Sequence, residues 1–280
     1  MVEAVTDDPG RARRVIGRRA VLGAALLFAL FLGLPIVVLV ARAAVGGSLA
    51  RSLVTPAVLD AVVLSLVTTS ASLALTVAIG LPLAFVLARR TFRGKRLAEI
   101  VIDLPIVLPP SVAGLALLLV FGSRGLLGGP LAALGWTIPF TTAAVILAQT
   151  FVSAPFFVRS ARAGIAAVDR DLEDAARVDG ASESHVFRTI TVPLASSALA
   201  AGLVMSWARA LGEFGATIMF AGSVEGRTQT LPLVVYAEFG AGDLDGSIAA
   251  AAVLVLAAFG VLAAVRVFHW GRALDARGLA

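Results

Sequence analysis

The 280-residue sequence contains no cysteine, and charged residues make up only 15% of it. Without cysteine the chain has neither disulfide bonds nor thiolate metal sites. Its two histidines, His185 and His269, lie far apart in the sequence, so we expect no metal site and no other cofactor. Soluble globular chains carry roughly 25% charged residues. The shortage of charge therefore favours a membrane protein.

Lysine is almost absent as well, because Lys95 is the only one. It is followed by Arg96, whereas a phosphate-binding P-loop needs a lysine followed by serine or threonine after a glycine. The apolar segments contain no Ser–His–Asp set and no glutamate-bearing metal motif. We therefore expect neither an ATPase nor another enzyme, which leaves transport or a scaffolding role.

Long apolar runs dominate what is present, since 59% of the residues are hydrophobic. A membrane-spanning helix needs about 20 apolar residues. The apolar stretch at residues 231–239 is too short to span and predicts a short helix. The sequence predicts an all-α membrane protein with one membrane domain over residues 20–268 and tails at 1–19 and 269–280. The six expected spans lie at residues 20–41, 61–88, 104–123, 139–158, 193–221 and 246–265.

The arginines indicate how the spans are oriented. Most of the 23 Lys and Arg residues lie in the two tails and in the loops after the second and fourth spans. Cytoplasmic loops collect such residues, so we expect a multi-pass protein with both termini in the cytoplasm. This placement beside the spans also explains the net charge of +5 without nucleic-acid binding. The opposite side carries only Arg42, Arg51, Arg124 and Arg227.

The first span has an alternative interpretation as a signal peptide. Two arginines, Arg18 and Arg19, precede its apolar run, as they do in some secretory signals. The run is longer than a typical signal core, and cleavage would leave five spans with the new N-terminus outside. We therefore expect the first span to be retained.

A polar stretch, DLEDAARVDGASESHVFRTITVPLASS, separates the fourth and fifth spans. Asp169, just before this stretch, is a suitable N-cap for a helix that begins at Arg170. Gly180 is suited to end that helix in a left-handed turn. Ser182 can cap a second short helix, and Pro193 is expected in the first turn of the fifth span. Residues 165–192 thus predict a loop of two short helices around a glycine turn.

This loop resembles the EAA motif of the permease subunits of ATP-binding-cassette importers. The pattern is E-A-A, three residues, Gly, nine residues and then I-x-L-P, and the spacing here is the same. Two positions differ, since Asp174 replaces the glutamate and Val192 replaces the leucine. The matching residues are Asp174, Ala175, Ala176, Gly180, Ile190 and Pro193.

The resemblance implies the importer permease fold of type I, with six spans and a cytoplasmic coupling loop in a prokaryotic cell membrane. It implies that the loop docks on a separate ATPase dimer, which binds the ATP in place of this chain. A second permease copy and an external oxyanion-binding protein complete the implied transporter. The residues that match the motif would be the ones that transmit the ATPase motion.

Two further segments, Ala208–Tyr236 and Ile102–Leu118, resemble the molybdate, tungstate and sulfate permease subfamily. They favour a molybdate importer, with sulfate or tungstate as the alternative substrate. A secondary transporter driven by an ion gradient, or a membrane scaffold, is the alternative from another class. A secondary transporter would tend to carry paired broken helices and acidic side chains at the bilayer midplane.

Polar residues within the expected spans are candidates for a translocation pathway. Arg209 and Glu213 lie four residues apart on one helix face and can pair, and ionisable residues in a span suggest a functional site. A pair that only fixes helix packing is the alternative. The same two interpretations, pathway or packing, apply to the polar residues Ser65, Thr69, Ser72, Thr76 and Gln149.

Overall fold

The structure is a computed structural model that describes residues 9–47, 49–50 and 55–275, with side chains described for 21–47, 49–50 and 55–263. Every regular element in these residues is a helix, which confirms the expected all-α class. The expected tails, 1–19 and 269–280, lie partly outside the described residues. Their described parts continue the helices α1 (Pro9–Val45) and α14 (Leu244–Asp275).

Four helices are long and apolar enough to cross a membrane: α1, α3 (Pro56–Arg89), α7 (Thr142–Ala166) and α14. They contain the first, second and sixth expected spans and most of the fourth. The start of α7 is fixed by Thr141, whose hydroxyl accepts a hydrogen bond from the Ala144 N–H at 3.3 Å. This helix continues well past residue 158, so it extends beyond the expected fourth span.

The expected third span, residues 104–123, is interrupted. Two helices, α4 (Lys95–Val107) and α5 (Pro110–Phe121), replace it and are bent by 119° relative to each other. Pro109 and Pro110 explain the break, because proline has no N–H to donate and disfavours a helical backbone in the residue before it. Leu108 accordingly has an extended backbone, with φ −67° and ψ 132°.

The expected fifth span, residues 193–221, is interrupted twice. The chain bends by 74° around Ala195, so Pro193 lies in a short helix before the bend and not in the first turn of the span. A second break follows Leu211. Counting each bent helix pair as one span gives up to six, the expected number. The elements are α9 (Glu183–Val186), the π-helix η1 (Phe187–Thr191), α10 (Val192–Leu194), α11 (Ser196–Leu211) and α12 (Gly215–Phe220).

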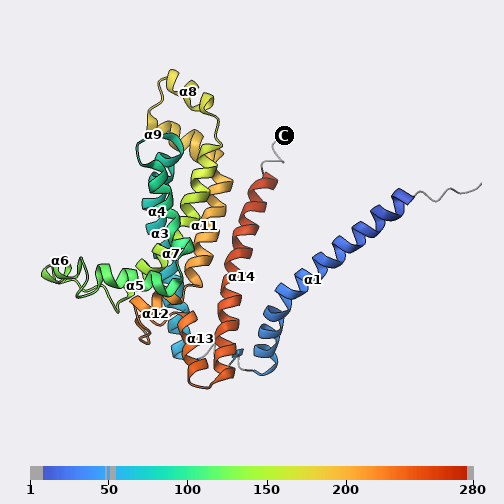
Figure 1. The fold of residues 1–280 in the computed structure, drawn as a ribbon, viewed down its shortest axis with the longest axis vertical. Helices are drawn as coiled ribbons and strands as arrows, with labels where there is room; N and C mark the ends of the chain where they lie inside the picture. Colours follow the sequence, from blue (N-terminus) through green and yellow to red (C-terminus); the bar gives the residue numbers. More distant parts are fainter. Residues whose placement is uncertain (1–8, 48, 51–54, 276–280) are drawn as a thin grey trace, which may run out of the picture.

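Three short helices complete the fold, and they lie outside the spans. The expected short helix at residues 231–239 is confirmed as α13 (Leu231–Gly240), which packs against α14. Helix α8 (Arg170–Val178) lies in the polar loop, and α6 (Gly128–Ala133) lies in a segment that extends sideways from the bundle (Figure 1).

The centre of the bundle is formed by α3, α7 and α11, which pack against one another. Alanine is frequent among its buried side chains, and small side chains allow helices in a membrane to approach closely. Another close approach joins α5 to α12. A Cβ atom on Gly114 of α5 would lie 2.6 Å from the backbone oxygen of Ala216 in α12, so only glycine fits there.

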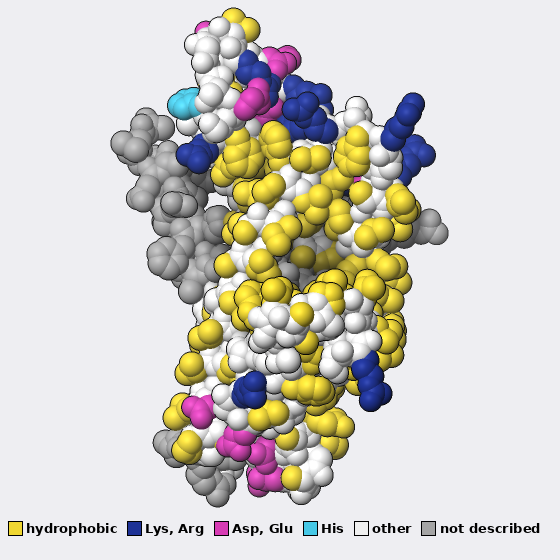
Figure 2. Space-filling view, turned by 90° about the vertical axis from the view of Figure 1, so that its left-hand side faces the viewer, with side chains coloured by type: hydrophobic (Ala, Val, Ile, Leu, Met, Phe, Trp, Pro, Cys, Tyr) yellow, Lys and Arg dark blue, Asp and Glu magenta, His cyan; other side chains and the backbone are white. Residues whose placement is uncertain are grey.

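The polar loop marks one end of the molecule, which we call the loop end (residues 167–195). The start of α1 and the end of α14 point toward the same end as this loop, whereas α13 lies at the opposite, far end (Figure 1). Helix α1 diverges from the bundle and packs mainly against α14. Figure 2 shows hydrophobic side chains over the middle of one face, with charged side chains toward its two ends.

Candidate functional site

The loop end begins with a capped helix. Asp169 accepts a hydrogen bond from the Asp171 N–H at 3.0 Å, which confirms the expected N-cap of α8. Asp171 and Glu173 lie in the first turn, where negative charge is favourable to the helix dipole. Local sequence signals therefore determine both the position and the start of this helix.

A glycine turn separates α8 from α9, as expected. Gly180 has φ +89°, in the left-handed region that glycine adopts at low cost. Ser182 then caps α9 by accepting a hydrogen bond from the His185 N–H at 3.4 Å. After α9 the chain forms the π-helix η1, which the sequence did not predict. π-helices are rare in proteins, and the single π turns that do occur are often found at functional sites.

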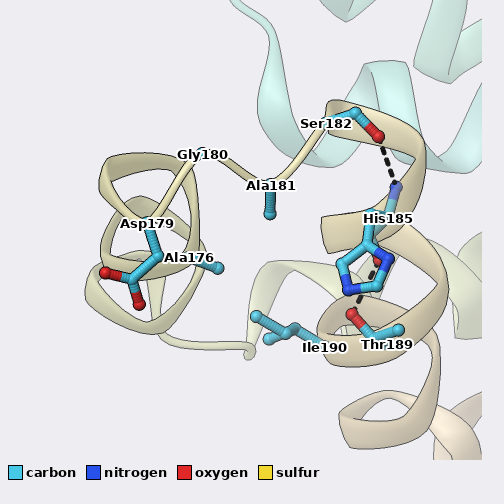
Figure 3. Close-up of a pocket in the computed structure, with 8 residues that line it drawn as sticks. All are labelled: Ala176, Asp179, Gly180, Ala181, Ser182, His185, Thr189 and Ile190. Carbon is cyan, nitrogen blue, oxygen red and sulfur yellow. Dashed lines mark hydrogen bonds between the residues drawn. The ribbon is translucent and has the colours of Figure 1, made fainter.

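The two arms of this turn enclose an open cleft of about 630 Å³ (Figure 3). Three residues of the EAA-like motif, Ala176, Gly180 and Ile190, line it. Asp174 and Ala175 lie on the exposed side of α8, and Pro193 lies beyond the cleft. The other lining residues are Asp179, Ala181, Ser182, His185 and Thr189.

Arg177 joins the two arms of the loop. Its Nε and Nη2 donate to the two carboxylate oxygens of Glu183 at 2.7 and 3.1 Å, and its Nη1 donates to Asp174 at 2.5 Å. These bonds raise the pKa of Arg177, the bond to Glu183 having the larger effect. The bond from Arg177 lowers the pKa of the Glu183 carboxyl below its usual value. The two bonds between Arg177 and Glu183 thus link α8 to α9.

A second, buried arginine joins the loop to the bundle. Arg89, the last residue of α3, donates from Nη2 to Glu173 Oε1 at 2.7 Å and to the Val168 carbonyl at 3.2 Å. Thr191, the last residue of η1, donates its hydroxyl to the same Oε1 at 2.6 Å. From the sequence, Arg89 is only an orienting charge and Glu173 only a first-turn acid. Their contact links residues far apart in the chain, and no spacing signal predicts it.

Two more ion pairs lie near this end, between α4 and α7. Arg162 pairs with Glu99, and Arg159 lies 3.7 Å from Asp103. All four side chains are partly exposed. They connect α4 to α7 directly and do not involve the loop.

Arg209 and Glu213 pair as expected, at the second break of the fifth span. Arg209 Nη1 lies 2.6 Å from Glu213 Oε2, and Glu213 Oε1 accepts a hydrogen bond from the Ala216 N–H at 2.7 Å. Glu213 lies beyond the end of α11, so the two residues do not share the continuous helix that the sequence predicted. The Glu213 side chain is 1% exposed, whereas that of Arg209 is 29% exposed. Arg209 therefore remains accessible.

The polar stripe on α3 lies between the helices. Ser65, Thr69, Ser72 and Thr76 are all buried, as is Gln149 on α7. Gln149 Nε2 donates to Thr69 at 3.4 Å, Thr150 donates to Ser72 at 3.1 Å, and Ser65 accepts from the Leu231 N–H at 2.8 Å. This geometry favours the packing alternative for the stripe. A pathway role for these residues stays a prediction.

The chain is similar to known proteins in both sequence and fold. Residues 80–276 match the family described as "Binding-protein-dependent transport system inner membrane component". The chain belongs to this permease family. It is a multi-pass inner-membrane component of a transporter that also uses a substrate-binding protein and an ATPase. This confirms, at the level of the family, the resemblance drawn from the EAA-like loop.

Individual permeases are similar over most of the chain. The molybdenum transport system permease protein ModB of Mycobacterium tuberculosis is 45% identical over 204 residues, which cover 73% of this chain and 77% of that protein. The molybdate/tungstate transport system permease protein WtpB of Pyrococcus abyssi is 38% identical over 203 residues, 72% of this chain and 76% of that protein.

Solved structures confirm the permease fold. A bacterial ABC transporter that imports the polysaccharide alginate has a chain that matches with a TM-score of 0.70 and 19% identity, covering 94% of this chain and 99% of that one. A chain of the MetNI methionine ABC transporter matches with a TM-score of 0.59 and 18% identity, covering 75% of this chain and 94% of that one. At this identity, the likeness concerns the fold alone.

Proposed function

We propose that this permease is the membrane-spanning subunit of an ATP-driven molybdate importer. The observation that carries the proposal is its 45% identity, over 73% of the chain, to a permease named for molybdenum transport. Tungstate is the second candidate, because a further relative is named for both anions. Sulfate is a third candidate, on the resemblance of Ile102–Leu118 and Ala208–Tyr236 to the wider subfamily.

The loop end is proposed as the surface that docks on the ATPase. Two apolar side chains, Leu172 and Val178, are exposed on α8, and Val178 is 87% exposed although it lies outside the membrane spans. The small side chains of Ala175 and Ala176 leave room for another helix to approach α8. Arg177 links α8 to α9 through its two bonds to Glu183. A rigid projection with exposed apolar side chains is suited to bind in a cleft of another protein.

Arg209 is proposed as a contact for the anion on its way through the membrane. Its guanidinium is partly exposed and lies where α11 ends, so it can offer N–H donors to an oxyanion. Glu213 holds Arg209 in place and lowers its net attraction for an anion, which favours release. Replacing Arg209 with alanine should impair uptake more than it impairs assembly, because Glu213 keeps its hydrogen bond to the Ala216 N–H.

A second copy of the chain is proposed to complete the pathway. The most apolar part of α1 is not buried by the rest of the chain, and α6 lies on an arm at the side of the bundle. Two copies would present two loop ends, one for each subunit of the ATPase dimer. We place the loop end and both termini in the cytoplasm, because arginines gather there. The far end, with α13, then faces the substrate-binding protein.

Transport by the reconstituted complex tests the proposal. The permease, its ATPase and its binding protein are placed in lipid vesicles, and uptake of radioactive molybdate is measured with and without ATP. We expect ATP-driven uptake that vanadate stops, that excess tungstate reduces and that sulfate reduces less. Uptake that an ionophore abolishes and that continues without ATP would instead support the secondary transporter.

A further inference from the structure

Three parts of the loop end converge on one buried contact. Glu173 lies on α8, Val168 lies in the link after α7, and Thr191 ends η1 on the way to α11. Arg89 donates to both Glu173 Oε1 and the Val168 carbonyl, and Thr191 donates to the same carboxylate oxygen. Val168 and Glu173, near the start of the loop, are thus bonded directly to the last residue of α3, and Thr191, near its end, is joined to it through Glu173.

The burial of this contact is unusual for a loop. Arg89 is 9% exposed and Glu173 is 2% exposed, whereas the other acids of α8 are exposed. A buried ion pair gains little net stability, because the desolvation of both charges offsets their attraction. Such a pair does impose a defined geometry. Stability alone is therefore a weak reason for an arginine and a glutamate at this position.

Besides the short link at residues 167–169, which joins α8 to α7, this contact connects α8 to a second spanning helix, α3. Helix α8 packs mainly against α9 and η1, which belong to the same loop. Helix α3 packs extensively against α7 and also contacts α11 and α13. A displacement of α8 therefore has two short routes into the bundle, through residues 167–169 to α7 and through Arg89 to α3, and a longer one through the 74° bend at Ala195.

We propose that Arg89 and Glu173 are the positioning residues through which motion of the docked loop enters α3. The inference rests on the proposed function, in which the ATPase binds the loop end. When the ATPase moves α8, the ion pair moves the end of α3 with it. The hydrogen bond from Thr191 to Glu173 moves η1 as well. Without the pair, α8 would move with the ATPase while α3 lagged behind, so ATP would be hydrolysed with less transport.

The test compares variants of the complete complex in vesicles, measuring molybdate taken up per ATP hydrolysed. Arg89→Met removes the charge and keeps much of the length, and we expect the ratio to fall about tenfold while the complex stays assembled. Glu173→Gln keeps an acceptor oxygen, so a fall of about threefold is expected. If the two residues act as one unit, the double variant is no worse than Arg89→Met.

The matched controls are Arg162→Met and Glu99→Gln, which break an ion pair between α4 and α7 that does not involve the loop. Their uptake per ATP should stay within about twofold of the unchanged complex. A merely structural role for Arg89 would lower the amount of assembled complex without changing the ratio. The conservative variant Arg89→Lys should restore most of the ratio, because it keeps the charge.

An assembled Arg89→Met complex with an unchanged ratio would overturn the inference. If that variant does not assemble, Thr191→Val decides, since it removes only one hydrogen bond to Glu173. A ratio that falls below those of the two control variants supports the inference, and a ratio equal to theirs overturns it. Uptake by the unchanged complex is measured first, because its absence would contradict the proposed function and not the role of Arg89.

Discussion

Two buried glutamates, Glu173 in the loop before the fifth span and Glu213 at the second break within it, differ in what they connect. Glu173 and Glu213 each pair with an arginine, at 2.7 and 2.6 Å, and each accepts a second hydrogen bond. Glu213 contacts residues next to it in the chain, whereas Arg89 lies 84 residues from Glu173. The first glutamate therefore determines how a loop is seated on the bundle, and the second shapes a local break.

Removing the Glu213 carboxylate should give the largest loss of stability. Glu213→Ala leaves Arg209 without its partner and the Ala216 N–H without its acceptor, at an expected cost of about 3 kcal/mol. Thermal unfolding of the detergent-solubilised permease measures the loss. Glu213→Gln is the control, because its amide oxygen still accepts the hydrogen bond, so a smaller loss is expected. Equal losses for both variants would show that the hydrogen bond contributes little.

A change at the loop turn should give a smaller loss of stability but a clear loss of coupling. Gly180→Val places a branched side chain at φ +89°, which costs about 1–2 kcal/mol, and open space around it means that no packed neighbour must move. Membrane insertion should be normal, whereas molybdate uptake per ATP should fall several-fold. Gly180→Asn, which tolerates this backbone, should retain most uptake. Normal uptake by the valine variant would contradict the role of the turn.

The smallest expected effect concerns the exposed pair of Arg177 and Glu183. The pKa of Glu183 is lowered, so its contribution to loop order is present above its usual pKa and disappears as pH falls through the lowered value. Spin labels on α8 and α9 should report a constant distance near neutral pH and a broader one in acid. Glu183→Gln should give the broader distribution at every pH. If the Glu183→Gln variant still responded to pH, the response would come from another titratable group.

Much of the loop end could be predicted because its signals are local. Asp169, Gly180 and Ser182 act on residues within one turn of themselves, and each takes its expected role. The breaks were harder to predict. Pro109 and Pro110 lie inside the expected third span and disrupt a helix there, but they alone do not show that the chain turns by 119°.

The contacts at the candidate site needed the structure for a different reason. Spacing shows that Ser65, Thr69, Ser72 and Thr76 share a face of α3, but not which neighbour covers that face. In the structure the neighbour is mainly α7, with the start of α13 at Ser65. Arg89 and Glu173 pose the same problem over a longer distance, because each has an ordinary local explanation that conceals their contact.

The π turn of η1 has a consequence for the length of the chain. Such a turn holds one residue more than an α turn. Deleting a single residue between Phe187 and Ile190 would allow an ordinary α-helix to form with Thr191 in nearly the same orientation, because the wide turn accommodates the extra residue while the turns beside it keep their faces. An extra residue in an unbroken α-helix would instead rotate everything after it by about 100°. The wide turn therefore lets this segment contain one surplus residue while the Thr191 hydroxyl still reaches Glu173.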